Sequence, residues 1–262
     1  MEHKYYKYKS KYLCLKNSLH SRIGFTGGGD NARLDIPTRK FIDELAAQNT
    51  EPVYKLSYED ARNVLNDLQK GQNIDVPTEN IDIPINDSPL NFSITLIRPK
   101  SLHMKSIPVL LYLHGAGFVM GNKETHERLV RELAFGADIA VAFVNYTPSP
   151  EAKYPVTLNQ GYRALEYISK NADKLYLNRD KIAIAGDSVG GYLATTIARM
   201  SKERNGPKIV FQALFYPMTD GTLSSESMKI FADGPWLTLN EMKWVYDAYL
   251  PENSDLRNPW IS

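Results

Sequence analysis

The most informative part of the sequence is Lys181-Ile-Ala-Ile-Ala-Gly-Asp-Ser-Val-Gly-Gly191, which runs directly into Tyr192-Leu-Ala-Thr-Thr-Ile-Ala-Arg-Met200. Its first half is an apolar run typical of a buried parallel strand. Leucine, isoleucine and methionine then recur at helical spacing. Ser188 therefore falls at a predicted strand-to-helix turn, inside the pattern Gly-x-Ser-x-Gly.

A turn this sharp leaves little room for side chains beside the serine, which explains Gly186, Gly190 and Gly191. It would present the Ser188 hydroxyl at a helix N-terminus, where the helix dipole favours developing negative charge. The pattern alone is weak evidence, because a glycine-rich turn with an incidental serine has the same letters. Its position between a strand and a helix favours a nucleophile.

A second motif begins at another predicted buried strand, 107–113, which ends in His114-Gly-Ala-Gly-Phe-Val-Met-Gly121. Small residues such as Gly115 let backbone amides come within about 3 Å of a developing oxyanion. Ala116 replaces the middle glycine of an HGGG-type loop but keeps its amide, so the function survives if the backbone there needs no positive φ. His114 is a candidate base, but a role in bracing the loop by hydrogen bonding is favoured.

Composition predicts a soluble, intracellular protein with one α/β domain and extensions, since 43% of the 262 residues are hydrophobic. Cys14 is the only cysteine, which excludes an intrachain disulfide. We expect no metal and no cofactor, because the sequence has no Cys/His metal-ligand spacing. It also has no apolar run of the about eighteen residues that a membrane span needs and no apolar signal segment.

The basic charge is local, because residues 1–40 hold nine Lys and Arg against three acids. Within them, 4–22 interleaves lysines with tyrosines and leucines, and as a helix it could contact an anionic membrane or a nucleic acid. A mobile leader or a helix packed on the domain is the plainer alternative. The leader is similar to those opening many giant DNA virus proteins, which suggests packaging in a virus particle. The glycines at 27–29 predict a flexible joint, not a phosphate-binding loop.

Three parts are predicted: a leader and joint at 1–31, a helical lid segment at 32–78 and a core at 79–262. Two amphipathic helices, 38–49 and one that follows a Ser57-x-x-Asp60 cap, make up the lid segment.

The core opens with a hairpin formed by 81–85 and 92–98. Helices are expected at 124–135, 156–171 and 240–250, further strands at 139–146 and 209–216, and an irregular region at 218–237. This alternation predicts a mostly parallel α/β sheet covered on both faces.

Several stretches together resemble the hormone-sensitive-lipase-like branch of the α/β-hydrolases, which includes small microbial carboxylesterases. They are 114–121, 146–155, 186–191, 216–220 and 231–238. The resemblance implies an α/β-hydrolase fold with an N-terminal helical lid over an acyl pocket. It also implies Ser188 as nucleophile, the amides of Ala116, Gly117 and Val189 as oxyanion hole, and Asp187 as a support of the turn outside the triad.

The chain departs from this pattern after Ser188, where the family has a catalytic acid and then a histidine. All its histidines lie upstream, at His3, His20, His103, His114 and His126. The acids beyond the serine, Asp220, Asp233, Asp247 and Asp255, have no base to orient. We therefore expect the family's last strands to be missing, which would leave 209–216 as an exposed edge.

A fragment of a longer protein is the favoured explanation, and a partner chain supplying the missing strands or a degenerate gene are the alternatives. The predicted function is a serine carboxylester hydrolase for short to medium acyl esters, impaired in this form. The alternative is a non-catalytic small-molecule-binding protein on the same fold. A third hypothesis makes the domain an interaction module anchored by its leader.

Overall fold

The structure is a computed structural model that describes residues 34–48, 50–71, 75–234 and 236–262. The predicted leader at 1–31, with its basic segment 4–22, lies outside the described residues. Among the helices of the described part, none has the length and apolarity needed to cross a lipid bilayer.

Six strands form one sheet in the order β1-β2-β4-β3-β5-β6. β1 and β2 are the predicted antiparallel hairpin, β2 is also antiparallel to β4, and the remaining neighbours are parallel. The expectation of a mostly parallel sheet is confirmed. The strands are β1 (Thr78–Ile85), β2 (Phe92–Pro99), β3 (Ile107–Leu113), β4 (Ala140–Asn145), β5 (Leu177–Asp187) and β6 (Ile209–Phe215).

The helices begin and end within a few residues of the predicted bounds, and the longer ones bury one face as their apolar spacing requires. They are α2 (Ile36–Ala47), α3 (Tyr58–Gln69), α4 (Lys123–Ala137), α5 (Val156–Lys170), α6 (Val189–Glu203), α7 (Glu226–Ile230) and α8 (Leu239–Tyr249), with 3-10 turns η2 (Val53–Lys55) and η3 (Lys100–Leu102). α7 lies in the segment predicted to be irregular. Its cap is Ser225, whose hydroxyl accepts from the amide of Met228.

Helices cover both faces of the sheet, so successive side chains of β3 are buried on opposite sides. Leu111 and Leu113 join the larger apolar cluster, which includes α5 and α6. Leu110 and Tyr112 join the smaller cluster with Val130 of α4. Burial on both sides explains why β3 is a nearly continuous apolar run.

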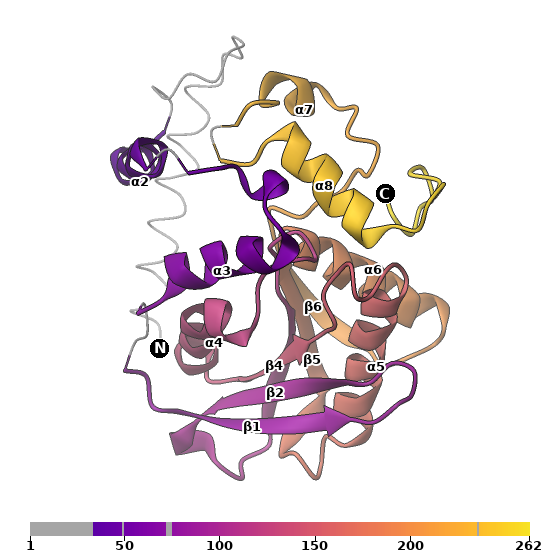
Figure 1. Cartoon of the computed structure of the whole chain (residues 1–262). Coiled ribbons are helices and arrows are strands. Elements are labelled where there is room, and N and C mark those ends of the chain that lie inside the picture. The colour runs from indigo at the N-terminus through magenta and orange to yellow at the C-terminus, as the bar shows by residue number, and fades with distance from the viewer. Residues whose placement is uncertain (1–33, 49, 72–74, 235) are drawn as a thin grey trace, which may run out of the picture.

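β3 and β5 are parallel neighbours, so the loop 114–121 after β3 and Ser188 after β5 leave the sheet at the same edge. Figure 1 shows α3 and α8 together at one end of the molecule, above the strands. At the far side of the sheet β6 is an edge strand that pairs, among the described residues, only with β5.

Candidate active site

Ser188 lies at the corner between β5 and α6, with a backbone conformation that residues other than glycine rarely adopt. Its φ is 53° and its ψ is −119°. The corner is held on both sides: the Ser188 amide donates to Phe215 O at 2.9 Å, and the Ser188 carbonyl accepts from the amides of Gly191 and Met218. A strained serine fixed by its surroundings is the geometry of a nucleophile elbow.

The flanking glycines are required by close backbone approach. A Cβ at Gly186 would lie 2.7 Å from the carbonyl oxygen of Leu113, and one at Gly190 would overlap the same oxygen. A Cβ at Gly191 would lie 2.8 Å from Cβ of Pro217. The first turn of α6 is therefore pressed against the end of β3, which brings the serine beside the loop 114–121.

The loop 114–121 contains three successive left-handed residues, Ala116 (φ 71°), Gly117 (φ 68°) and Phe118 (φ 62°). The sequence-based condition that Ala116 needs no positive φ is therefore wrong. Alanine carries a Cβ into this region at a cost of about 1–2 kcal/mol. The alanine nevertheless keeps the amide that the middle glycine would supply.

Several backbone amides of the loop and of the first turn of α6 have no protein acceptor in the described part of the chain, among them those of Ala116, Gly117 and Val189. Unpaired main-chain donors are uncommon in folded proteins, and they recur at helix N-termini and anion sites. Gly115 also lies against the residue before the serine, since a Cβ there would be 2.8 Å from the Asp187 carbonyl oxygen. The loop that carries Ala116 and Gly117 thus lies against the elbow through Gly115, and Val189 directly follows the serine. The oxyanion-hole role of the three amides stays a prediction.

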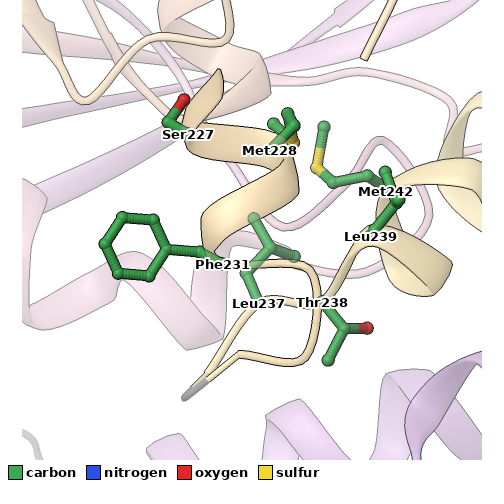
Figure 2. A pocket seen from close by; sticks show the side chains of 7 residues that line it. All are labelled: Ser227, Met228, Phe231, Leu237, Thr238, Leu239 and Met242. Atoms are coloured by element: carbon green, nitrogen blue, oxygen red, sulfur yellow. The ribbon is translucent and has the colours of Figure 1, made fainter. Parts of the chain in front are cut away.

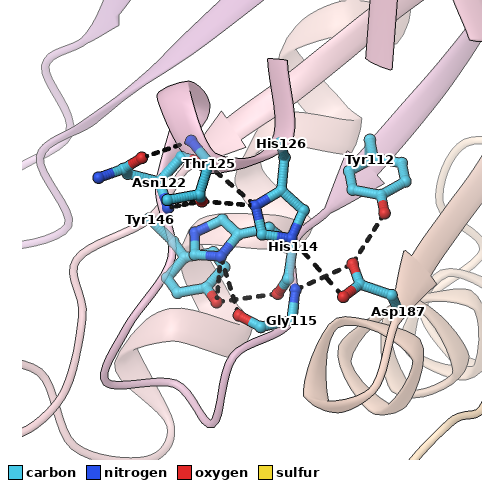
Figure 3. Close-up of polar contacts among 8 residues, drawn as sticks. All are labelled: Tyr112, His114, Gly115, Asn122, Thr125, His126, Tyr146 and Asp187. Carbon is cyan, nitrogen blue, oxygen red and sulfur yellow. Dashed lines mark hydrogen bonds and ion pairs between the residues drawn. The ribbon is translucent and has the colours of Figure 1, made fainter. Parts of the chain in front are cut away.

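Asp187 ties the elbow to the loop (Figure 3). Its Oδ1 accepts from the Tyr112 hydroxyl at 2.7 Å and from the Gly115 amide at 3.0 Å. Its Oδ2 lies 3.6 Å from Nε2 of His126. Burial alone would raise the pKa of the Asp187 carboxyl, but His126 and the Tyr112 hydroxyl outweigh it and hold this pKa below its ordinary value. Asp187 therefore stays ionised and holds Gly115 in place.

His114 is buried beneath the loop and stacks on Tyr146, with ring centroids 4.1 Å apart. Its Nδ1 lies 3.0 Å from Gly115 O, and the Tyr146 hydroxyl donates to His114 O at 2.9 Å. Burial, followed by the charge of His126, lowers the pKa of His114 to about 3, so the ring is neutral. These contacts support the predicted bracing role.

No base for the serine is found among the described residues: the histidines there, His103, His114 and His126, make no hydrogen bond to the Ser188 hydroxyl. Two of the downstream acids are engaged in local turns, because Asp220 accepts from the amide of Thr222 and Asp255 from that of Arg257. The described residues contain no group of His, Cys, Asp and Glu that could hold a metal ion.

An apolar cavity of about 230 Å³ lies between α7 and α8 (Figure 2). It is lined by Ser227, Met228, Phe231, Leu237, Thr238, Leu239 and Met242. Val245, one turn beyond Met242, contacts the loop, since a Cβ at Gly117 would lie 2.5 Å from its Cγ1. One helix therefore borders both the cavity and the candidate oxyanion hole.

Two residues at this site carry no functional prediction from the sequence. The ring of His126 is oriented by Thr125, whose Oγ1 lies 2.8 Å from the His126 Nδ1. Val245 belongs to an apolar face of α8 that is typical of any amphipathic helix. Their contacts with Asp187 and Gly117 span more than sixty positions of sequence, and local spacing carries no signal of that kind.

Comparison with known proteins agrees with this geometry. The profile of the alpha/beta hydrolase fold matches residues 110–262. A putative alpha/beta hydrolase of Acanthamoeba polyphaga mimivirus is 37% identical over 99% of this chain and 73% of its own length. The esterase LipI of Mycobacterium tuberculosis is 38% identical over 58% of this chain, and an esterase of Gibberella moniliformis is 38% identical over 62%. The chain spans 47% and 52% of these two esterases, about half of their length.

Solved structures of esterases share the fold. A thermostable esterase from Pseudomonas putida superposes with a TM-score of 0.82 at 32% identity, covering 91% of this chain and 73% of that one. An ester-hydrolase from the metagenome of Lake Arreo, complexed with a bipyridine phosphonate derivative, gives 0.81 at 28% identity, covering 87% and 74%. The chain therefore belongs to the α/β hydrolase fold family, among the hormone-sensitive-lipase-like serine hydrolases of the carboxylesterase type.

Proposed function

We propose that the protein is a serine carboxylester hydrolase for short to medium acyl esters. The observation that carries the proposal is the strained Ser188 at the start of α6, next to a loop. The amides of Ala116, Gly117 and Val189 in these two segments have no protein acceptor in the described part of the chain. In the proposed reaction the serine oxygen attacks the ester carbonyl, and these amides stabilise the oxyanion. The bond between the carbonyl carbon and the alcohol oxygen then breaks, and the alcohol leaves with the proton that the serine hydroxyl has lost. Water hydrolyses the acyl-enzyme to the free acid and restores the serine hydroxyl.

The proposed chain-length preference rests on the cavity between α7 and α8. Its side chains are mostly apolar, which suits an acyl chain, and its volume of about 230 Å³ is below the roughly 300–1,000 Å³ of drug-sized ligand sites. Long acyl chains would exceed it.

We also propose that these 262 residues alone are impaired, because no histidine follows Ser188. Loss of one triad member costs about 10⁴ to 10⁶ in turnover, while an oxyanion hole and a binding pocket leave a residual rate above that in water. The exposed edge of β6 supports the related proposal that a partner chain supplies further strands.

The test is covalent labelling with a fluorophosphonate, which reports an activated serine without requiring turnover. We expect a mass increase of one adduct per chain, located at Ser188, and no adduct in Ser188→Ala. A folded sample that stays unlabelled would refute the hydrolase proposal for these residues. Hydrolysis of p-nitrophenyl butyrate faster than of the palmitate ester would then support the chain-length preference.

The second candidate is a non-catalytic protein that binds a small apolar molecule in the same cavity. The missing histidine and the apolar lining favour it. Saturable binding of a medium-chain fatty acid, without Ser188 labelling and without ester turnover, would support this alternative. A Met242→Glu variant should abolish such binding, because it puts a charge into the cavity.

The roles of the leader stay predictions. Contact of residues 4–22 with anionic vesicles or DNA would be lost on deleting 1–26, and binding that persists would remove the leader from consideration. Packaging in a virus particle likewise stays a prediction.

A further inference from the structure

Helix α3 presents one stripe of side chains to the elements around the loop 114–121. Tyr58, Arg62 and Asn66 are four residues apart and therefore share a face of the helix. Tyr58 stacks on Trp244 of α8, with ring centroids 5.3 Å apart. Asn66 Oδ1 accepts from Nδ2 of Asn122, the cap of α4, at 3.0 Å.

Arg62, at the centre of the stripe, contacts the loop itself. Its Nε donates to Val119 O at 2.9 Å, and its NH2 nitrogen donates to Ser149 O at 2.9 Å. Glu151 orients the guanidinium through a two-pronged contact of 2.9 and 2.7 Å. Planar guanidinium groups are suited to such fixed, multiple hydrogen bonds, and a lysine cannot reproduce them.

The acceptors of Arg62 are next to the strained part of the loop. Val119 follows the left-handed residues 116–118, and the amide of Ser149 donates to Phe118 O at 2.9 Å. Arg62 therefore joins the two chain segments that hold this turn. Successive left-handed residues persist only where their surroundings over-determine them.

We propose that Arg62 is a positioning residue that holds loop 114–121 in its left-handed conformation, so that docking of α3 and assembly of the oxyanion hole are one event. The role of Arg62 in assembling the oxyanion hole rests on the proposed hydrolase activity, whereas its role in holding the loop does not. Loss of Arg62 would leave the binding cavity unchanged, because none of its lining residues touches the guanidinium.

Hydrogen–deuterium exchange in Arg62→Met tests the role in holding the loop. The reporters are the amides of Met120 and Ser149, which are bonded to Ala116 O and Phe118 O and so are protected only while the turn is formed. We expect both to exchange at least about tenfold faster in the variant, with β3 and β5 unchanged. Wild-type exchange at these two amides would overturn the proposal.

Fluorophosphonate kinetics test the role in assembling the oxyanion hole. We expect the maximal labelling rate to fall about tenfold to a hundredfold in Arg62→Met, while the half-saturating probe concentration stays within about twofold, because an oxyanion donor acts in the transition state. An unchanged maximal rate would contradict the proposal. An unlabelled wild type would instead refute the hydrolase activity and leave the exchange result to decide the role in the loop.

Two further variants separate positioning from folding. Arg163→Met removes an exposed arginine that pairs with Asp87 and Glu166, and it should change neither readout. Arg62→Lys keeps the positive charge but loses the several hydrogen bonds of the guanidinium, so its effect should approach that of Arg62→Met. The lysine variant also serves as the test variant if the methionine variant does not fold. Wild-type behaviour of the lysine variant would show that charge alone suffices and overturn the positioning role.

Discussion

Ala116 holds a left-handed backbone, φ 71°, at a position where a glycine would be unstrained. Replacing it with glycine removes a strain of about 1–2 kcal/mol but adds about 0.5–1 kcal/mol of chain entropy to the unfolded state. We therefore expect Ala116→Gly to stabilise the fold by about 0–1.5 kcal/mol in urea unfolding, with Ser188 labelling retained.

The control for this prediction is Ala137→Gly on the exposed last turn of α4, where the backbone is helical. It should destabilise by about 0.5–1 kcal/mol, the opposite sign. Equal losses of stability in the two variants would show that the alanine at 116 is not strained.

His114 makes stability sensitive to mild acid. Burial and then the charge of His126 lower its pKa from 6.5 to about 3. Between these values the unfolded chain binds a proton that the folded chain does not, so stability falls as pH falls through this window, by up to about 1.4 kcal/mol per pH unit.

His114→Phe should therefore flatten the decline in stability between pH 6.5 and pH 4, whatever its cost at neutral pH. Urea unfolding at several pH values measures the slope. The pKa of Asp187 is also lowered, so this carboxyl contributes a further loss of stability only at pH values below its ordinary pKa of 3.8. An acid slope that matches the wild type would assign the effect to another group.

At the scale of elements, the end of β2 is fixed by a buried arginine. Arg98 is 2% exposed, and its guanidinium donates to the carbonyl oxygens of Leu102, Lys105, Leu175 and Tyr176 at 3.0–3.3 Å. Arg98→Met would fill the space but leave these acceptors unpaired, so we expect a loss of about 2–4 kcal/mol in urea unfolding. Arg163→Met, which breaks only exposed ion pairs, should cost less than about 1 kcal/mol. Similar losses in both would contradict the role of Arg98.

Most strands and helices could be predicted, because the spacing of apolar residues reports burial locally. The polar positions Thr95 and Arg98 show the limit of that argument, since both are buried while the alternation in 92–98 predicts only a strand. The elbow was predictable from its glycines. The residues that support the loop could not be predicted. Arg62, His126 and Val245 are distant in sequence from the residues they contact, and such contacts produce no periodic pattern in the sequence.

At the scale of the whole molecule, the sheet is covered unevenly. The interior strands are enclosed by α4 on one face and by α5 and α6 on the other. β6, in contrast, exposes the apolar side chains of Val210, Phe211, Leu214 and Phe215 along an edge that, among the described residues, pairs only with β5. An apolar edge with unpaired backbone groups is a template for pairing with another chain.

We therefore expect this chain to associate in a concentration-dependent way, and a charge on the edge to weaken that association. Phe211, 62% exposed at the centre of β6, is the position to change, because a lysine there disfavours strand pairing. Sedimentation velocity at several concentrations should show a larger fraction of monomer for Phe211→Lys than for the wild type. Phe135→Lys on α4 is the matched control: its phenylalanine is 46% exposed but belongs to a helix, which offers no strand edge for pairing. If both lysines act equally, exposed apolar area drives the association; if only Phe211→Lys acts, the open edge of the sheet does.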